Sequence, residues 1–399
     1  MKPRVICVMG RALDQLDGLG VYSANLLRHM MAQDPMTHYV ILLRSERNAL
    51  IFKECPNAEI QVIPSRSKIW WDQVLVPLAA RRVDADIIFN PKFSLPLFSK
   101  RPGVFVLHGS DWYINPGNYS WQDNKYIRIM LPIYCRKATR LLSIAPIVVD
   151  DLVKHARLDP CKVIVTYAAA APHFRFIEDK TSLKNFAQRY FLPERFILTV
   201  GRVCHTGNDR LDEYPGGNNE TLIRAYHHYR AAGGNLPLVV VGKDIEKYLR
   251  HHGFGNRELE GIHFTGFIPN AEIVNIYNLA EFFVLATLYE SFCLPLMEAM
   301  ICGCPALVPV TGAPPQIGGE AARYVDPHDE YAMGKAMSEI ANSTELRAQL
   351  RVAGLERSRQ FTWEKTAKMT LEVFDSIVPA AKEISSNSPP SSKIPLATH

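Results

Sequence analysis

The sequence predicts an α/β protein with two Rossmann-like, doubly wound domains that face each other across a cleft. Two observations lead to this fold class. Short apolar runs rich in β-branched residues alternate with longer segments of helical period, which is typical of parallel sheets covered by helices. The chain also has 399 residues, 47% of them hydrophobic and 21% charged, and this length exceeds that of one ordinary domain of about 100–200 residues.

The expected strands fall into two series of apolar runs. The first series covers residues 5–9, 39–43, 60–63, 86–90, 104–108 and 141–144. The second series covers residues 196–200, 238–241, 262–265, 282–286 and 306–310. Two series of this size predict two doubly wound sheets instead of one large sheet.

The domain boundary is expected near residues 168–181, which gives an N-terminal domain over 1–175 and a C-terminal domain over 176–360. Residues 361–378 have the apolar spacing of a closing helix, expected to pack back toward the N-terminal domain. Residues 379–399 are rich in Ser, Pro and Lys and predict a disordered tail.

The composition favours a cytoplasmic protein without bound metal. The eight cysteines form no disulfide framework and no paired spacing typical of structural zinc, which fits a reducing compartment. No apolar run approaches the roughly 18–20 residues needed to span a bilayer, and the N-terminal apolar stretch is too short for a signal peptide.

The net charge of +5 conceals an asymmetry, because residues 1–175 carry +9 and residues 176–399 carry −4. A basic half could face nucleic acid, an anionic membrane or a phosphorylated substrate, or it could be an ordinary soluble surface. Basic residues beside Trp70 and Trp71 could dock on lipid head groups, and the same tryptophans could instead pack in the core or line the cleft. No nucleic-acid-binding pattern accompanies the charge, so nucleic acid is not expected as a partner.

The strongest local motif follows the strand expected at 282–286. Pro295 suits the first turn of a helix and Gly303 suits its C-terminal cap, so the segment is predicted to run strand, loop, helix. Backbone N–H groups at the start of such a helix point past the carboxyl edge of the sheet, where open α/β folds hold a phosphate. Glu290 and Glu298 can reach the same crevice as acceptors for sugar hydroxyls. Alternatively, Glu298 is a solvated helix-surface residue and Glu290 complements the helix dipole.

The run Glu-Ser-Phe-Cys-Leu-Pro-Leu-Met-Glu that begins at Glu290 resembles the signature of family 4 retaining glycosyltransferases, also called glycosyltransferase group 1. These enzymes have the GT-B fold, and the similarity extends from residue 1 to about residue 378. Further matching segments are the glycine loop at 17–22, the segments at 143–145 and 150–154, the Gly-Arg turn at 200–202, the base-binding turn at 265–268, and residues 313–327. Each segment is weak alone, but their order and spacing together are specific.

The resemblance implies a catalytic set and a donor-binding set. The catalytic residues would be His108, Glu290 and Arg202. The donor-binding residues would be Gly18, Gly20, Arg202, Phe267, Ile268, Glu290, Ser291, Phe292, Cys293, Leu294 and Glu298. Glu290 would contact hydroxyls of the donor hexose, and Glu298 would contact the ribose. An arginine is suited to the leaving diphosphate because its planar, always charged fork matches the oxygens that gain charge.

Two positions depart from the family pattern. After His108 the family usually has an aspartate, whereas this chain has Gly109, and Asp111 follows two residues later with an open role. The family also supplies a lysine for the diphosphate clamp where this chain has Asn218. Arg210 and Lys243 are the candidates to replace that cation.

The sequence therefore predicts a retaining glycosyltransferase that moves a hexose, mannose favoured, from a nucleoside diphosphate sugar to a hydroxyl of a lipid-linked or polymeric glycan. The resemblance favours GDP-mannose over UDP-glucose and implies surface-polysaccharide synthesis, such as lipopolysaccharide or exopolysaccharide. The N-terminal domain would bind the acceptor and the C-terminal domain the donor. Neither a cofactor nor a divalent metal is expected, and a peripheral location at the inner face of the cytoplasmic membrane is an option.

Two other classes of function stay open at this point. A non-catalytic sugar-nucleotide- or glycan-binding subunit would keep the fold and tolerate the absent lysine. A nicotinamide-dependent oxidoreductase would also use two Rossmann-like domains, but it should carry a full glycine fingerprint and a ribose-binding acid.

Overall fold

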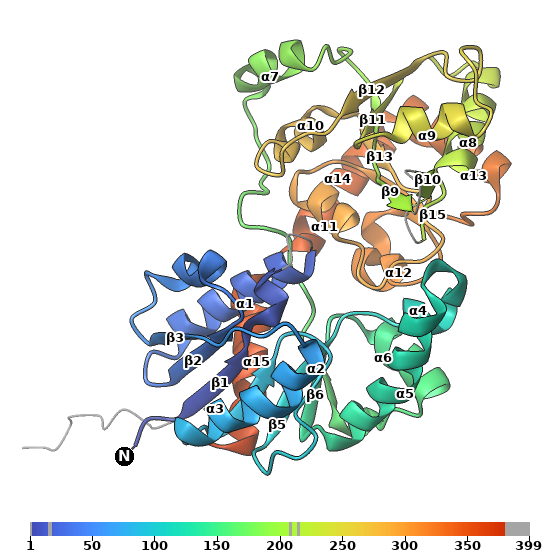
Figure 1. Cartoon of the computed structure of the whole chain (residues 1–399). Coiled ribbons are helices and arrows are strands. Elements are labelled where there is room, and N and C mark those ends of the chain that lie inside the picture. Colours follow the sequence, from blue (N-terminus) through green and yellow to red (C-terminus); the bar gives the residue numbers. More distant parts are fainter. Residues whose placement is uncertain (1, 15–17, 207–209, 214–215, 380–399) are drawn as a thin grey trace, which may run out of the picture.

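The computed structural model describes residues 2–14, 18–206, 210–213 and 216–379, which form two α/β domains (Figure 1). A seven-stranded parallel sheet has the order β3-β2-β1-β4-β5-β6-β7, and a six-stranded parallel sheet has the order β12-β11-β8-β13-β14-β15. Each order reverses once, between β1 and β4 and between β8 and β13. Two doubly wound sheets are the predicted fold class, which is thereby confirmed.

The N-terminal domain is built from buried strands that are nearly continuous apolar runs, as expected for a sheet covered on both faces. Its strands are β1 (Val5–Met9), β2 (His38–Leu43), β3 (Ala58–Val62), β4 (Ile87–Asn90), β5 (Gly103–Leu107), β6 (Arg140–Ser143) and β7 (Val163–Val165). Its helices are α1 (Gly18–Gln33), α2 (Lys68–Trp70), α3 (Val76–Arg82), α4 (Asp111–Ile114), α5 (Trp121–Lys137) and α6 (Pro146–Ala156).

The C-terminal domain repeats this plan and adds an antiparallel hairpin. Its main strands are β8 (Ile197–Val200), β11 (Leu238–Val241), β12 (Ile262–Gly266), β13 (Phe282–Val284), β14 (Ala306–Pro309) and β15 (Arg323–Val325), and the hairpin is β9 (Val203–Thr206) with β10 (Arg210–Glu213). Its helices are α7 (Lys184–Arg189), α8 (Asn219–Ala231), α9 (Ile245–His251), α10 (Ile273–Leu279), α11 (Leu294–Ile301), α12 (Pro314–Gly318), α13 (Glu330–Asn342) and α14 (Thr344–Ser358).

Both faces of the C-terminal sheet are buried, and successive residues of a strand point to opposite faces. Ile197 and Phe282 belong to one apolar cluster, whereas Leu198 and Phe283 belong to another that continues into the N-terminal domain. This alternation follows from the two-residue period of a strand. The continuous cluster joins the domains on the side where the chain passes between them.

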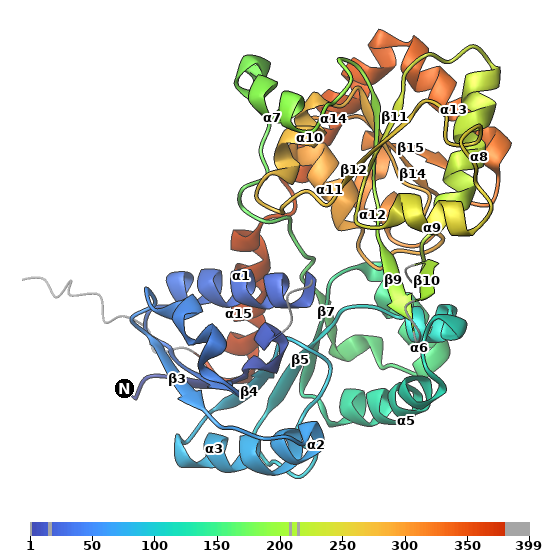
Figure 2. The ribbon, with the colours of Figure 1, turned by 45° about the horizontal axis from the view of Figure 1, so that its top comes forward.

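The chain passes between the domains twice, first after β7 and again between α14 and α15 (Trp363–Ile377). The second passage brings α15 back to the N-terminal domain, where it crosses α1 and packs against it (Figures 1 and 2). Phe374 of α15 is fully buried and packs edge-on against Phe89, with ring centroids 5.2 Å apart. The Trp363 indole N–H donates a 2.8 Å hydrogen bond to the carbonyl of Ala170.

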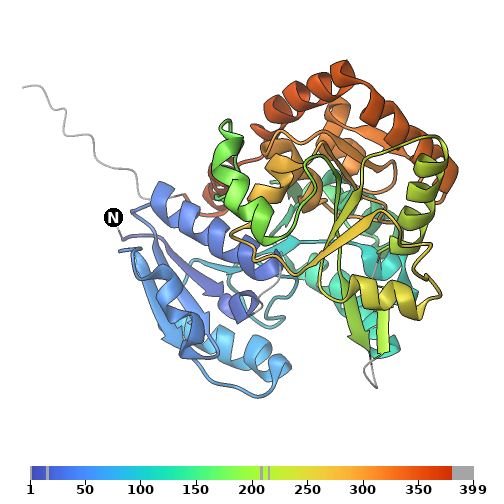
Figure 3. The ribbon, with the colours of Figure 1, turned by 90° about the horizontal axis from the view of Figure 1, so that it is seen from above.

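The C-terminal domain lies over one side of the N-terminal domain. That side is formed by the later elements of the N-terminal domain. In the view from above, the early elements, coloured blue, lie to one side, whereas the cyan and green elements lie beneath the C-terminal domain (Figure 3). Segments that follow β5 and β6 therefore face the second domain, and these segments contain the predicted residues His108 and Asp111.

Candidate functional site

The predicted donor residues gather where the strand order of the C-terminal sheet reverses. Ligands of open α/β sheets bind outside the carboxyl ends of the strands at such a reversal. Arg202 follows β8 and Glu290 follows β13, the two strands on either side of it. The β9–β10 hairpin projects from this edge toward the N-terminal domain (Figure 2), so the long loop after Arg202 carries an element that the sequence did not reveal.

Helix α11 begins at this edge with a strained residue. Cys293 precedes the helix with φ of +71°, in the left-handed region that costs a non-glycine residue about 1–2 kcal/mol. Leu294 is the first helical residue, Pro295 lies in the first turn, and Gly303 follows the last turn with φ of +66°. Cys293 turns the chain into the first turn of α11, where a helix has backbone N–H groups without a partner in a preceding turn.

Glu290 is held in place by the loop that follows β14. The N–H of Ala313 donates a 2.8 Å hydrogen bond to the Glu290 carbonyl. A Cβ atom on Gly312 would lie 2.6 Å from that same oxygen, and Gly312 has φ of +70°. Only glycine allows this approach, so the position of the Glu290 backbone depends on Gly312.

The two glutamates of the signature lie in a poorly hydrated environment. Burial raises the pKa of Glu290 to about 7; the Asp111 charge adds to this rise, and the Arg202 guanidinium opposes it. Burial also raises the pKa of Glu298 to about 8, against a 3.2 Å hydrogen bond donated by the Tyr277 hydroxyl. Glu298 is half-buried and accepts its hydrogen bond from the buried Tyr277, which weighs against its interpretation as a solvated helix-surface residue.

The remaining predicted donor residues follow neighbouring strands or the same loop. Phe267 follows β12 and is 68% exposed, whereas the next residue, Ile268, is buried. Ser291 and Phe292 continue the loop after Glu290; Ser291 is half-buried, and the buried Phe292 ring packs edge-on 6.1 Å from Phe361. Of these two predicted donor residues after β12, Phe267 alone presents its side chain to solvent.

Asn218, which stands where the family has a lysine, has a structural contact. Its side-chain amide donates a 2.7 Å hydrogen bond to the carbonyl of Pro327, and the residue immediately precedes α8 without a capping hydrogen bond from its side chain. Lys243 is exposed in the turn after β11, next to β8 in the sheet. Arg210 begins β10, but its side chain lies outside what the structure describes. Of the two candidate cations, Lys243 is the one whose position at the carboxyl edge can be followed.

His108 follows β5 on the N-terminal side of the site. Its Nε2 atom donates a 2.7 Å hydrogen bond to the carbonyl of Pro91, which places a proton on that nitrogen. The ring also packs edge-on against Tyr22 of α1, with centroids 4.7 Å apart. In the first turns of the same helix Gly20 is buried, and a Cβ atom on Gly18 would lie 3.9 Å from Leu294. The beginnings of α1 and α11 therefore face each other across the domains.

The absence of an aspartate after His108 has a steric reason. A Cβ atom on Gly109 would lie 2.8 Å from the Ser291 hydroxyl oxygen of the other domain. Asp111 is turned toward its own domain, where it accepts 2.6 Å hydrogen bonds from Tyr119 and Asn115. A side chain at position 109 would require the Ser291 hydroxyl to move in this arrangement of the domains.

A polar cluster that the sequence did not reveal joins the domains beside Glu290. The Ser110 hydroxyl donates a 2.6 Å hydrogen bond to Asp151 of α6, and it lies 2.6 Å from the Tyr289 hydroxyl. The Tyr289 hydroxyl also donates to Asp151, and burial raises its pKa. We call Ser110, Asp151 and Tyr289 the cross-domain cluster. Tyr289 immediately precedes Glu290, so the cluster connects the position of Glu290 to the placement of the domains.

In the part of the chain that the structure describes, no group of three or more His, Cys, Asp or Glu side chains is arranged to hold a metal ion. No helix of the described residues is both long and apolar enough to cross a membrane. The two tryptophans differ in exposure. Trp71 is fully buried and packs in the core, whereas Trp70 is 55% exposed, so its side chain is accessible from outside.

Two doubly wound domains with their carboxyl edges facing one another define the GT-B class of glycosyltransferase folds. Two family profiles match the chain, one described as Glycosyltransferase Family 4 over residues 16–169 and one described as Glycosyl transferases group 1 over residues 214–357. The chain belongs to this family of glycosyltransferases. This membership removes the nicotinamide-dependent oxidoreductase from the possible functions.

Two similar sequences are mannosyltransferases of Escherichia coli. The serotype-specific mannosyltransferase WbdA is 26% identical over 257 residues, which are 62% of this chain and 30% of WbdA. O-antigen chain mannosyltransferase B is 29% identical over 113 residues, which are 28% of this chain and 30% of that protein. The chain thus matches about three tenths of the length of each relative.

Solved structures show the same fold at low sequence identity. Anabaena HepE in complex with UDP superposes with a TM-score of 0.68 at 15% identity, over 94% of this chain and 100% of that chain. WaaG, a glycosyltransferase involved in lipopolysaccharide biosynthesis, superposes with a TM-score of 0.66 at 14% identity, over 94% and 99% of the two chains.

Proposed function

We propose that this protein is a retaining glycosyltransferase that transfers a hexose from a nucleoside diphosphate sugar to a hydroxyl of a lipid-linked or polymeric glycan. Mannose is the favoured sugar and GDP-mannose the favoured donor before UDP-glucose, because the WbdA and mannosyltransferase B matches are both to mannosyltransferases. The UDP and UDP-glucose complexes of HepE support a nucleotide-sugar donor. The observation that carries the proposal is the placement of poorly hydrated Glu290 near Arg202 at the strand-order reversal.

The proposed donor site combines positively charged groups with carboxylates that can accept hydrogen bonds. Arg202 and the first N–H groups of α11 would bind the diphosphate, Glu290 the hexose hydroxyls and Glu298 the ribose. A carboxylate that has lost its water gains most from a hydroxyl that donates to it, because the hydrogen bond replaces lost hydration. The raised pKa values of both glutamates therefore fit a site that sugar hydroxyls complete.

The proposed reaction retains the configuration of the anomeric carbon and needs neither a separate protein base nor a divalent metal. The bond from the anomeric carbon to the diphosphate oxygen breaks, and the bond to the acceptor oxygen forms on the same face. The acceptor proton passes to the departing diphosphate, whose charge Arg202 and α11 stabilise. Closure of the domains excludes water, and His108 lies on the N-terminal side, where the acceptor would bind.

Transfer assays with site variants and matched controls test the proposal. Glu290→Ala and Arg202→Ala should each abolish transfer from GDP-mannose and UDP-glucose while the circular-dichroism spectrum stays unchanged. Glu246→Ala and Arg250→Ala are matched controls, because these residues form an exposed ion pair on α9, and both should keep full activity. Wild-type turnover by either site variant would contradict the assignment, and an inverted anomeric product would contradict retention.

A non-catalytic binding subunit is the alternative, favoured by the structural hydrogen bond of Asn218 in place of a cation. Calorimetry would then detect donor binding by the purified chain, with neither transfer nor hydrolysis of the donor in any acceptor mixture. Transfer of sugar by the purified chain alone would exclude this alternative.

We also propose peripheral association with the inner face of the cytoplasmic membrane through the N-terminal domain. Trp70 of α2 and Trp121 of α5 are both more than half exposed, and residues 1–175 carry a net charge of +9. Indole rings favour the interface, and basic residues favour anionic lipid. Sedimentation with phosphatidylglycerol vesicles should exceed that with phosphatidylcholine vesicles, and Trp70→Ser with Trp121→Ser should reduce it; equal sedimentation with both lipids would contradict the proposal.

A further inference from the structure

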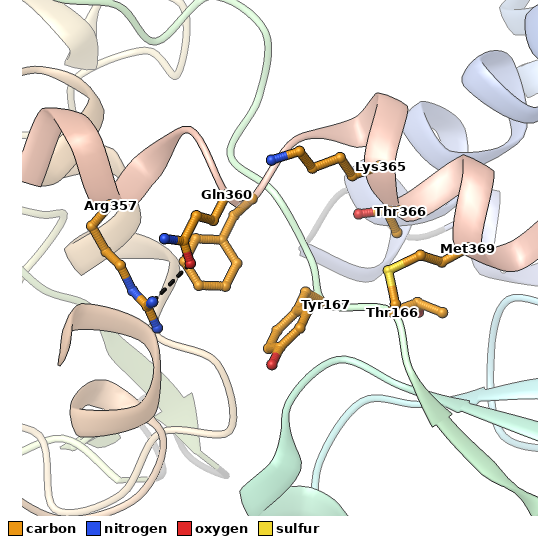
Figure 4. A pocket seen from close by; sticks show the side chains of 8 residues that line it. Thr166, Tyr167, Arg357, Gln360, Lys365, Thr366 and Met369 are labelled. Atoms are coloured by element: carbon orange, nitrogen blue, oxygen red, sulfur yellow. Dashed lines mark hydrogen bonds between the residues drawn. The ribbon is translucent and has the colours of Figure 1, made fainter.

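A cavity of about 200 Å³ lies between the two segments that connect the domains (Figure 4). Tyr167 contributes from the first connection, which follows β7. Arg357 contributes from the end of α14, Gln360 from the second connection, which joins α14 to α15, and Lys365 from the beginning of α15. None of the predicted donor residues lines this cavity, so it is separate from the donor site.

The wall of the cavity is positively charged. Arg357 and Lys365 both line it, and no aspartate or glutamate does. Arg357 donates to the carbonyls of Gln316 and Ile317 and to the Gln360 side chain, and Lys365 donates to a backbone carbonyl. Neither cation forms an ion pair with a carboxylate among the residues that the structure describes. The carbonyls orient the two cations without neutralising them, so the cavity favours an anion.

The volume of the cavity limits the size of the anion that it can hold. Drug-sized ligands occupy pockets of roughly 300–1,000 Å³, so a nucleotide sugar is too large. A single water needs about 10–15 Å³, so the space of about 200 Å³ has room for an ion of the size of phosphate and a small ester group. An arginine fork and a lysine ammonium are the usual partners of phosphate oxygens.

Residues that line the cavity pack against the signature loop of the C-terminal domain as well as against each other. The Tyr167 ring packs edge-on against Phe361 at 5.2 Å, and Phe361 in turn packs against Phe292 of the signature loop at 6.1 Å. Tyr167 has φ of +59°, an unfavourable conformation for a non-glycine residue that its surroundings must maintain. A ligand in this cavity would contact both connections at once.

We infer that this cavity binds a small phosphate-bearing anion between Arg357 and Lys365, and that the anion stabilises one placement of the two domains. The ligand is either inorganic phosphate or a small phosphate monoester, since both present the same oxygens. The inference does not depend on the proposed reaction, because binding can be measured without a sugar donor.

Thermal unfolding with inorganic phosphate, at ionic strength held constant with KCl, tests the binding. The midpoint should rise with phosphate until it saturates. Lys365→Gln should weaken the apparent affinity about tenfold or more, since a charge-assisted hydrogen bond contributes about 1.5–3 kcal/mol. Lys368→Gln is the matched control, because Lys368 is exposed on the same helix and does not line the cavity. A rise that does not saturate, or that both variants lose equally, would overturn the inference.

Two further measurements locate the anion. Arg202→Ala should keep the phosphate response; its loss would place the ion in the donor site and overturn the inference. Hydrogen exchange should slow at residues 166–171 and also at residues 359–363 when phosphate is bound, and slowing at one connection alone would refute the bridging role. Tighter binding of mannose 6-phosphate than of phosphate would identify a monoester as the ligand, and equal binding would identify free phosphate.

Discussion

Replacing Glu290 with glutamine should stabilise the protein at alkaline pH even though it abolishes sugar transfer. Burial raises the pKa of this carboxyl from 4.5 to about 7. Because the folded-state pKa lies above the unfolded one, the contribution of Glu290 to stability is present below pH 4.5 and is lost as the pH rises through 7. At about 1.4 kcal/mol per pH unit, the loss above pH 8 is about 3 kcal/mol. Glutamine resembles the protonated acid, so the variant should not show this loss of stability.

Calorimetric melting at pH 5 and pH 8.5 measures this effect. A stability difference of about 3 kcal/mol corresponds to about 6–12 °C in the Tm of a domain of this size. Glu290→Gln should exceed the wild type by that amount at pH 8.5 and by little at pH 5. Glu246→Gln, on the exposed face of α9, should show no such gap. An equal difference at both pH values, or none at pH 8.5, would refute the conclusion that an ionised Glu290 destabilises the empty site.

Five other substitutions and one chelation test the cross-domain geometry and the proposed donor site. Tyr289→Phe removes a hydroxyl of the cross-domain cluster and should lower kcat about five- to tenfold with the Kd for nucleoside diphosphate unchanged; an unchanged kcat would show that the cluster is not needed. Gly109→Ala should slow transfer because its Cβ would lie 2.8 Å from the Ser291 oxygen and the hydroxyl would have to move, and Ser291→Gly should restore part of the rate if that contact is the cause. Asn218→Lys should tighten donor binding in calorimetry while lowering the Tm, because it supplies a cation but loses the bond to Pro327, whereas Asn218→Ala should lower the Tm alone. Incubation with EDTA should leave the transfer rate unchanged, and activity recovered only by added manganese would contradict the metal-free mechanism.

Buried parallel strands could be predicted because each is a continuous apolar run. β1 begins and ends where the sequence predicts, and so does β11. β7 and β15 were missed because each is an edge strand of only three residues; β7 is apolar but too short to stand out as a strand, and in β15 the Arg323 side chain is exposed. The β9–β10 hairpin was missed because its alternation is too weak to distinguish it from a loop.

Part of the candidate site could also be predicted from the sequence, and part could not. Glu290 and Glu298 could be proposed because a strand, a proline and a glycine within one short segment predict where the loop lies. The contact of Tyr289 with Asp151 could not, because 138 positions separate them and the contact depends on how the two domains are placed. The steric reason for Gly109 depends on that same placement, since its neighbour Ser291 belongs to the other domain.

The return of α15 to α1 means that the domain synthesised first is completed last. Phe89 and Arg4 await partners that leave the ribosome more than 280 residues later, since Phe374 packs on Phe89 and Asp375 pairs with Arg4 at 2.5 Å. The C-terminal domain is in this sense inserted into the N-terminal one. A fragment that ends at the first connection would expose part of its core, and an isolated N-terminal domain would need residues 363–378 joined to it.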